Sequence, residues 1–432
     1  MKRLLIALIA VFVVLTGCGS NNGSNNQTEN KPQASNTPAE SKQSTEQIVL
    51  DFPTYQANEP GFKDWWEGLI EDYGNKYPEA RVEMTYVPNS NFINTLMTRF
   101  AANDAPDIIM LPSNNFIQIA SDGWLAPLDT FMAQTDIPDT WSSLQSQMQL
   151  EGSTYGLVLL GHSVSLYYNE KMLKDAGLDV PSTPQQLIDA AKALTKDGVF
   201  GFGMTTTTNP NVYNDAAYWL IGQGQHWLDE NGNYKLTQPE VVQAFDTVRQ
   251  LYNYSPEGLS PEQYRQMFFD GKVAMIIDGP WVYAMKETAN PEIAEHVQVA
   301  PPPFKVYPGR LANNLSLPES IPPEKKEWAW KFIELAASPE WQRKYAELTQ
   351  NPPAMKDVLT PDIYDKYPQL KVFSDLSKDA VNIMPPSENI MKNYNEFSNL
   401  IQDAMMRMMT TKDSTEAILT DLQNQLNAKV AP

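Results

Sequence analysis

The chain has 432 residues, a formal net charge of −20 and 10 % aromatic residues. This length predicts two or three domains and is enough to bury a large core. The acidic balance argues against nucleic acid as a partner. With a single cysteine, Cys18, the chain forms no internal disulfide.

The first residues are typical of an export signal. Met1-Lys2-Arg3 is basic, and the apolar run over residues 4–15 is too short to span a membrane but suits a signal peptide. It leads into Leu15-Thr16-Gly17-Cys18, which resembles a bacterial lipobox. The sequence predicts a signal peptide over residues 1–17 and a lipid anchor on Cys18, outside the cytoplasmic membrane. The alternative is an ordinary signal peptide with an incidental cysteine.

Beyond the anchor, the composition changes from a linker to a folded domain. Residues 18–47 carry the cysteine and a tether of Asn, Ser, Gln, Thr and Pro, which has too few apolar side chains to order itself. Strands are then predicted over residues 48–52, 81–87 and 107–111, with amphipathic helices over residues 62–73 and 92–100. This β-α-β-α-β order is typical of a parallel sheet with right-handed crossovers.

The rest of the chain also mixes strands and helices. Extended segments are predicted over residues 199–205, 273–277, 296–299 and 313–321. Helices are predicted over residues 170–176, 184–194, 216–221, 241–252, 325–337, 338–348, 401–409 and 415–426. Residues 227–236 contain Asp-Glu-Asn-Gly-Asn, which predicts a hairpin turn.

The stretch Phe268–Trp281 places a tryptophan at the end of a short buried strand. The apolar run Val273–Ile277 is followed by Gly279-Pro280. Because a proline cannot donate to a sheet ladder, the strand must end by Asp278. Ligands of open α/β proteins bind beyond the carboxyl ends of strands. Trp281 is therefore either a binding residue or a core residue that terminates the strand.

The sequence carries no motif for catalysis, nucleotide binding or metal binding. It contains neither a Gly-x-x-x-x-Gly-Lys loop nor His-Glu-x-x-His. Its three histidines, His162, His226 and His296, lie too far apart in the sequence to suggest a metal site. We expect no cofactor and no metal. A glycosidase pair could still be hidden among the many carboxylates, because no local motif singles one out.

Several short blocks occur in order along nearly the whole predicted mature domain. They are Ala105-Pro106-Asp107-Ile108-Ile109, Gly123–Asp129, Tyr155-Gly156-Leu157, Leu166–Leu173 with Ala176-Gly177-Leu178, Gly271–Met275 with Gly279-Pro280-Trp281, and Glu327–Ile333 with Ser338-Pro339-Glu340. In content, order and spacing, these blocks resemble the extracellular solute-binding proteins of ABC importers, family 1, the relatives of the maltose-binding protein.

The resemblance implies an α/β fold of the periplasmic-binding-protein type, class II. Two lobes, each a sheet flanked by helices, are joined by a hinge that closes around a ligand. The implied N-terminal lobe comprises residues 48–160 and 313–354, and the C-terminal lobe comprises residues 161–312 and 355–432. The connecting segments are expected near residues 160–161, 308–314 and 351–355.

The resemblance also implies a sugar or oligosaccharide in the cleft between the lobes. A sugar ring stacks its C–H face on an aromatic ring, and its hydroxyls need hydrogen-bond partners. By position, Trp281 matches the family's stacking tryptophan. The other expected ligand contacts are Tyr55 and Gln56 after the first strand, Asn114 and Asn115 after the third, His162 at the hinge, Tyr213, Asn214 and Asp215 in a loop before a helix, Asn313, and Tyr394 near the start of a late helix.

Two departures from the family argue against maltose itself. The maltose binder has an acid where this chain has His162, and many relatives have Gly-Gly where it has Asn313-Asn314. Side chains at 313 and 314 either reach the ligand or fill space in the cleft.

The sequence therefore predicts a monomeric, lipid-anchored binding protein that hands a sugar to an ABC permease and performs no chemistry. One alternative is a non-sugar ligand such as glycerol phosphate, which clustered Lys and Arg in the cleft loops would favour. The named loops lack them. The other alternative is a secreted glycosidase lipoprotein, which needs two carboxylates about 5–10 Å apart.

Overall fold

The computed structural model describes residues 47–59, 61–209, 211–378 and 380–432. The predicted signal peptide, Cys18 and the tether through residue 46 lie outside the described residues. In the part of the chain that is described, no helix combines the length and apolar character needed to cross a membrane.

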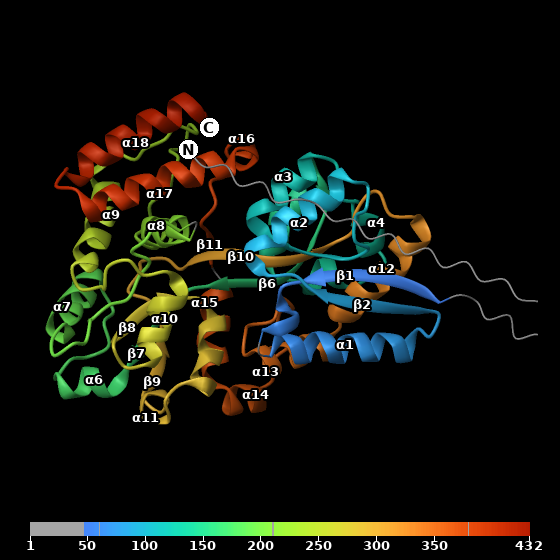
Figure 1. Ribbon diagram of the computed structural model, residues 1–432, viewed down its shortest axis with the longest axis horizontal. Helices are drawn as coiled ribbons and strands as arrows, with labels where there is room; N and C mark the ends of the chain where they lie inside the picture. Colours follow the sequence, from blue (N-terminus) through green and yellow to red (C-terminus); the bar gives the residue numbers. More distant parts are fainter. Residues whose placement is uncertain (1–46, 60, 210, 379) are drawn as a thin grey trace, which may run out of the picture. The chain divides into compact units, whose positions relative to one another are not determined.

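The first two strands form the predicted parallel pair. β1 (Ile48–Thr54) and β2 (Ala80–Tyr86) align with Ile48 opposite Ala80. α1 (Phe62–Lys76) connects them and lies along the pair in Figure 1. It packs there because one face of the helix is apolar; the buried residues are Phe62, Trp65, Trp66, Leu69 and Tyr73. α2 (Asn89–Ala101) then leads to β3 (Ile109–Pro112).

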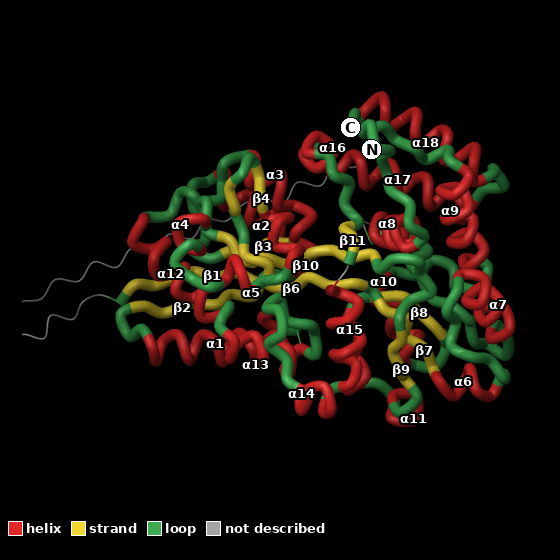
Figure 2. The backbone as a smooth tube through the Cα atoms, turned by 180° about the vertical axis from the view of Figure 1, so that it is seen from behind, coloured by secondary structure: helices red, strands yellow, loops and turns green. Residues whose placement is uncertain are grey.

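A long antiparallel pair connects distant parts of the chain. β6 (Leu157–Ser163) pairs with β10 (Pro308–Ser316), and the two strands lie side by side in Figures 1 and 2. The pairing sets Arg310 opposite His162, with irregular register around Asn313. β10 also pairs antiparallel with β3 and in parallel with β11 (Val381–Asn382). β3 is linked to β1 through the backbone amides of residues 107 and 108, which donate to the Asp51 carbonyl at 3.0 and 3.1 Å.

A second sheet contains the strand before Trp281. β7 (Ser165–Asn169) lies between β8 (Met275–Asp278) and β9 (Val297–Ala300), antiparallel to both. β8 ends at Asp278, as the following Gly-Pro predicts. The strand predicted over residues 199–205 is wrong: Phe200 and Gly203 make only isolated bridges to Val273 and Ile276. Glycines weaken a strand because they lose more backbone entropy and pack no side chain.

The remaining elements are short strands, helices and 3-10 turns around these sheets. The short strands are β4 (Gln149–Leu150) and β5 (Ser153–Thr154). The helices are α3 (Phe116–Ser121), α4 (Asp129–Met132), α5 (Ile137–Thr140), α6 (Glu170–Asp175), α7 (Pro184–Leu194), α8 (Val212–Gly222), α9 (Pro239–Tyr252), α10 (Pro261–Phe269), α11 (Pro291–Ala294), α12 (Pro323–Ala336), α13 (Pro339–Thr349), α14 (Pro361–Lys366), α15 (Pro368–Lys378), α16 (Glu388–Lys392), α17 (Tyr394–Thr410) and α18 (Thr415–Lys429). The 3-10 turns are η1 (Gln56–Asn58), η2 (Ser113–Asn115), η3 (Ser143–Met148) and η4 (Pro280–Thr288).

The buried apolar side chains form three hydrophobic clusters. The first draws on residues 50–160 and 311–358. The second draws on residues 164–277 and 383–430, and the smaller third lies within residues 167–373. The chain thus passes from the first cluster to the second just after Leu160, within the β6 region. The predicted lobe boundaries stay a prediction.

The close approach of Gly201 to α7 can be tested by substitution. A Cβ at residue 201 would lie 1.9 Å from the Ala191 carbonyl oxygen, so Gly201→Ala must displace backbone. We expect it to lower the free energy of unfolding by about 1–3 kcal/mol, as overpacked substitutions do. Urea denaturation measures this.

The matched control is Gly74→Ala in α1, where a Cβ meets nothing within 4 Å. Alanine is about 1 kcal/mol more favourable than glycine inside a helix, so this variant should be as stable as the wild type or more so. A Gly201→Ala variant of wild-type stability would contradict the placement of residues 200–203 against α7.

Candidate functional site

Trp281 is the second residue of η4, directly after the Gly279-Pro280 corner that follows β8. Its ring folds back over Gly279, where a Cβ would come within 2.2 Å of the indole. Only glycine therefore leaves room for the ring in this position. The indole is partly buried and packs against both the first and the third hydrophobic cluster. The corner predicted from the sequence thus places a tryptophan between two hydrophobic clusters.

The imidazole of His162 braces Trp281. The two rings meet edge to face, with centroids 4.7 Å apart and planes at 87°. Nδ1 lies 3.1 Å from the Ser163 carbonyl oxygen. Burial and, second, the charge of Arg310 lower the pKa of His162 to about 3. The ring is therefore neutral near pH 7.

A neutral imidazole carries only one N–H. Because Nδ1 faces a carbonyl oxygen, Nδ1 is the donor and Nε2 an acceptor. Nε2 has no hydrogen-bond partner among the described residues, and His162 is 0 % exposed. In this structure His162 supports the indole and lines no open surface.

Arg310 was not singled out in the sequence, yet it lies among the predicted ligand residues. Burial raises the pKa of Tyr218 to about 12, and the Arg310 guanidinium opposes that rise. The same charge acts on Tyr55, Tyr213 and Tyr394. A signal was available, because Arg310 is the only charged residue in the predicted connecting segment 308–314.

Tyr55 and Asn313, two of the predicted ligand contacts, lie next to each other. The Tyr55 hydroxyl donates to Asn313 Oδ1 at 2.7 Å. Gln56 is different: its Oε1 accepts from the Trp66 indole N–H at 3.1 Å, and it is 2 % exposed. The Asn314 side chain is also hydrogen-bonded within the protein interior, because its Nδ2 donates to the Leu111 carbonyl at 3.0 Å. Asn313, rather than Asn314, therefore has its side chain hydrogen-bonded to another predicted ligand contact, Tyr55.

The expectation of a loop at Tyr213, Asn214 and Asp215 is wrong. These residues lie in the first turn of α8, which begins at Val212, before the predicted start at residue 216. Polar and acidic side chains are favoured in the first turn of a helix, so their polarity did not mark a loop. Tyr213 is fully buried, and its hydroxyl donates to the Ile383 carbonyl at 3.0 Å. Asn214 Nδ2 donates to Asn211 Oδ1 at 3.1 Å.

Asp215 borders a cavity of about 10 Å³, room for about one water molecule. The lining residues are Phe202, Gly203, Met204, Asp215, Tyr218, Trp219, Tyr264 and Ile277. Asp215 is half-buried as a residue, but its Oδ2 is buried and has no hydrogen-bond partner in the described part of the chain. Burial is the main reason that the pKa of Asp215 rises to about 7. Burial of a carboxyl favours its neutral form, and here burial outweighs the opposing effect of Thr205 on this pKa.

Asp278, by contrast, is fully satisfied. It accepts from the Tyr264 hydroxyl at 2.6 Å and from Arg265 Nε and Nη2 at 2.7 and 3.1 Å. The amide of Gly279 adds a fourth bond at 2.7 Å. Arg265 also lies 5.9 Å from the Trp281 ring centroid. This network fixes the end of β8, and thus the start of η4.

The remaining predicted residues occupy the expected elements. Asn115 ends η2, after β3, and is half-buried. Asn114 lies in the same turn, but its side chain lies outside what the structure describes. Tyr394 begins α17 and meets Tyr213 edge to face, with centroids 5.4 Å apart.

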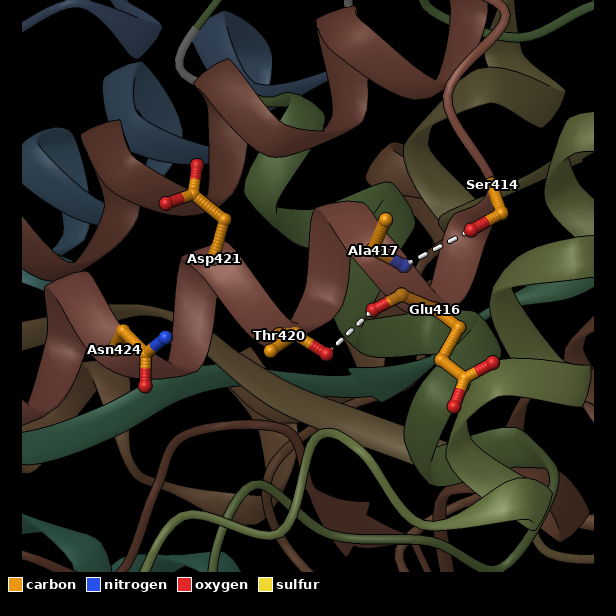
Figure 3. A pocket seen from close by; sticks show the side chains of 6 residues that line it. All are labelled: Ser414, Glu416, Ala417, Thr420, Asp421 and Asn424. Atoms are coloured by element: carbon orange, nitrogen blue, oxygen red, sulfur yellow. Dashed lines mark hydrogen bonds between the residues drawn. The ribbon is translucent and has the colours of Figure 1, made fainter.

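A second hollow, of about 420 Å³, lies on α18 and is shown in Figure 3. Its walls are Ser414, Glu416, Ala417, Thr420, Asp421 and Asn424. The two hydrogen bonds drawn there are local helix bonds, from the Ala417 amide to Ser414 Oγ and from the Thr420 hydroxyl to the Glu416 carbonyl. These short side chains come from one stretch of helix and include no aromatic ring. The candidate site is therefore the region around Trp281.

Comparison with known proteins identifies the family. Residues 57–343 match the model of the family described as "Bacterial extracellular solute-binding protein". The chain belongs to this family. The predictions of an extracellular binding protein and of no enzymatic activity are thereby confirmed at the level of the family.

Individual relatives span almost the whole chain. A maltooligosaccharide ABC transporter solute-binding lipoprotein of Streptococcus pneumoniae R6 is 23 % identical over 408 residues, covering 88 % of each protein. The structure of maltose-bound T. maritima MalE3 is 21 % identical, covers 88 % of this chain and 99 % of that one, and has a TM-score of 0.78. UgpB from Mycobacterium tuberculosis in complex with glycerophosphocholine is 17 % identical, covers 88 % and 98 %, and has a TM-score of 0.76.

These structures confirm the predicted α/β periplasmic-binding-protein fold. MalE3 and UgpB carry chemically different ligands on the same fold. The fold therefore does not select the ligand, and the side chains of the site must do so.

The burial of Asp215 can be tested through the pH dependence of stability. Its pKa rises from 3.8 unfolded to about 7 folded, so folding binds a proton between these values and stability falls as pH rises through this window. Asn does not titrate. We expect the stability gain of Asp215→Asn over the wild type to grow by about 3 kcal/mol from pH 5 to pH 8. Urea denaturation of the ligand-free protein at both pH values measures this.

The control is Asp189→Asn, which removes an exposed carboxylate on α7 and should show a much smaller pH-dependent difference. If Asp215→Asn behaved like this control, Asp215 would not be buried as placed.

Proposed function

We propose that this protein is the lipid-anchored, extracellular substrate-binding component of an ABC importer and that it binds a neutral sugar or short oligosaccharide. The observation that carries the proposal is the partly buried Trp281 indole, held by Gly279 and braced by a neutral His162. An aromatic face held rigidly in this way suits the C–H face of a sugar ring, since little side-chain entropy remains to be lost on binding.

The polar groups at the predicted ligand positions suit hydroxyl groups. Tyr55 and Asn313 are already hydrogen-bonded to each other, and a phenol or amide can both donate to and accept from a sugar. Asp215 supplies an acceptor, and Arg310 supplies donors beside the tyrosines. A buried hydroxyl without a partner would cost about 1–3 kcal/mol, so this mixture favours a ligand with many hydroxyls.

The proposed binding mode is closure of two lobes over the ligand. Their proposed extents are residues 48–160 with 313–354, and residues 161–312 with 355–432. The change of hydrophobic cluster just after Leu160 supports the first boundary. Trp281 packs against two clusters, so closure of the lobes would change the surroundings of its indole. Binding would select the closed state.

The proposed anchor and partner rest on sequence and on relatives. The lipobox-like run ending at Cys18 supports lipidation. The pneumococcal relative is itself named a lipoprotein of an ABC transporter. We therefore place the protein on the outer face of the bacterial cytoplasmic membrane, where it delivers its ligand to permease subunits.

One observation favours a second candidate, a ligand that carries a phosphate. Arg310 lies among the predicted ligand residues, although the predicted loops themselves lack Lys and Arg. Arg265, however, is neutralised by its salt bridge to Asp278. Asp215 adds a further acidic group. One arginine beside a carboxyl is a weaker anion site than clustered cations, so a neutral sugar is the better candidate.

A thermal-shift panel separates the two candidates. The panel contains maltose, maltotriose, arabinotriose and diacetylchitobiose, with glycerol 3-phosphate and glycerophosphocholine as the charged members. We expect at least one neutral sugar to raise the melting temperature, because a ligand at a hundred times its Kd adds about 2.7 kcal/mol of stability. If only a phosphate compound raised it, the sugar assignment would be wrong.

Trp281→Ala tests the site. We expect at least tenfold weaker binding of the best sugar in the panel, or about 1.4 kcal/mol, because the stacking surface is lost while the polar contacts stay. Isothermal titration calorimetry gives Kd, and the melting temperature of the ligand-free variant confirms folding. The matched control is Trp328→Ala, a partly buried tryptophan of α12 that packs on Lys331. Wild-type affinity in Trp281→Ala, or equal losses in both variants, would refute the assignment.

A further inference from the structure

The cavity beside Asp215 combines a small space with an unsatisfied acceptor. It has room for about one water-sized group. Asp215 Oδ2 is buried there without a partner among the described residues. A buried acceptor without a partner is unfavourable, so a group that donates a hydrogen bond here gains more than it would at an exposed carboxylate.

The neighbours of Asp215 do not supply that donor. Tyr264 of α10 gives its hydroxyl to Asp278 of β8 at 2.6 Å. Arg265 of α10 is engaged by the same carboxylate. Tyr218, on the same helix as Asp215, faces Arg310. Thr205 is the remaining polar neighbour, and its side chain and backbone oppose the rise of the Asp215 pKa. Its Oγ1 nevertheless makes no hydrogen bond to Asp215 Oδ2, because both atoms are without a partner among the described residues. The network around β8 is complete without Asp215, which leaves its Oδ2 for a group from outside.

The end of β8 links the cavity to the candidate stacking residue, because Ile277 lines the cavity and Trp281 follows the strand. Asp278 acts electrostatically on both Asp215 and His162, and His162 contacts Trp281. The same short end of β8 therefore borders the cavity and carries the indole. A ring stacked on Trp281 could direct one of its hydroxyl groups into this space.

We propose that the cavity is a subsite for one hydroxyl group of a neutral sugar, which donates to Asp215 Oδ2, and that binding there releases a proton from Asp215 to solvent. This inference rests on the proposed function. The ligand keeps its hydroxyl hydrogen, and the carboxylic acid of Asp215 becomes a carboxylate as its proton leaves. Sugar binding by this protein is therefore coupled to pH.

The direction of the coupling follows from the two states of Asp215. In the ligand-free protein burial raises the pKa of Asp215 to about 7, so about half of the molecules carry the proton at pH 7. A hydrogen bond donated to the carboxylate stabilises the charged form and lowers this pKa. The affinity for the sugar must then increase as the pH is raised to about 7. Below pH 7 it decreases by at most about tenfold for each unit by which the pH is lowered.

Three titratable neighbours of this region, His162, Tyr218 and Tyr264, do not titrate in the same range as Asp215. Burial and, second, Arg310 hold the pKa of His162 near 3, so its ring stays neutral. Burial raises the pKa of Tyr218 to about 12 and that of Tyr264 well above its usual value. Arg265 and Asp278 are joined in a salt bridge. A separate carboxyl, Glu59, has its pKa raised by burial to about 7 and must be controlled for.

The test is calorimetric titration of the full chain with the neutral sugars of the panel at pH 6, 7 and 8. At each pH, buffers with different ionisation enthalpies count the protons released. We expect about half a proton released at pH 7, less at pH 8, and a Kd several-fold weaker at pH 6 than at pH 8. Asp215→Asn should abolish the release and flatten the pH dependence. Glu59→Gln, the matched control, should keep both.

Each outcome decides the inference. If a sugar binds without proton release, or with proton uptake, the wild-type data alone overturn the subsite while the proposed function stands, whether or not Asp215→Asn folds. Loss of the release in Glu59→Gln instead of Asp215→Asn also overturns it. If no neutral sugar binds at any of the three pH values, the proposed function fails, and the inference fails with it.

Discussion

The antiparallel pairing of β6 with β10 is the constraint on which the candidate site depends. It joins segments about 150 residues apart in the sequence and sets His162 opposite Arg310. The buried β6 backbone finds its hydrogen-bond partners across this pair, so neither strand can shift without leaving buried amides unpaired. His162 then packs edge to face against Trp281, and the charge of Arg310 acts on the tyrosines. Asn313 accepts a hydrogen bond from Tyr55. One ladder therefore brings together side chains that come from separate parts of the chain.

The buried polar groups of the site are held in neutral or paired forms. His162 has no charge near pH 7, and Asp278 is matched by Arg265. Only Asp215 combines burial, an unpaired oxygen and a pKa near neutrality within this set. A site of this kind has little free charge with which to attract ions, but it has acceptors and donors whose desolvation is already complete. Hydroxyl groups exploit such a site better than a doubly charged phosphate does, because they bring less charge to be desolvated.

Local signals in the sequence predicted much of the fold and the position of Trp281 after β8. The break at Gly279-Pro280 was enough to end β8 and to place Trp281 at a corner, because proline restricts hydrogen bonding wherever it occurs. Long-range pairing could not be predicted in this way. Arg310 was missed because its role depends on the strand opposite it, and Tyr213 was misplaced because the start of α8 lies four residues before its clear apolar period. Gln56 has the polarity of a ligand contact, yet the Trp66 indole takes its carbonyl oxygen inside the core.

The decisive measurement is a crystal structure of the protein with a neutral sugar bound. We expect a sugar ring whose C–H face lies against the Trp281 indole, with one hydroxyl oxygen within hydrogen-bond distance of Asp215 Oδ2. A ligand bound elsewhere, for example in the hollow on α18, would contradict it. So would a sugar between the lobes that leaves the indole face uncovered.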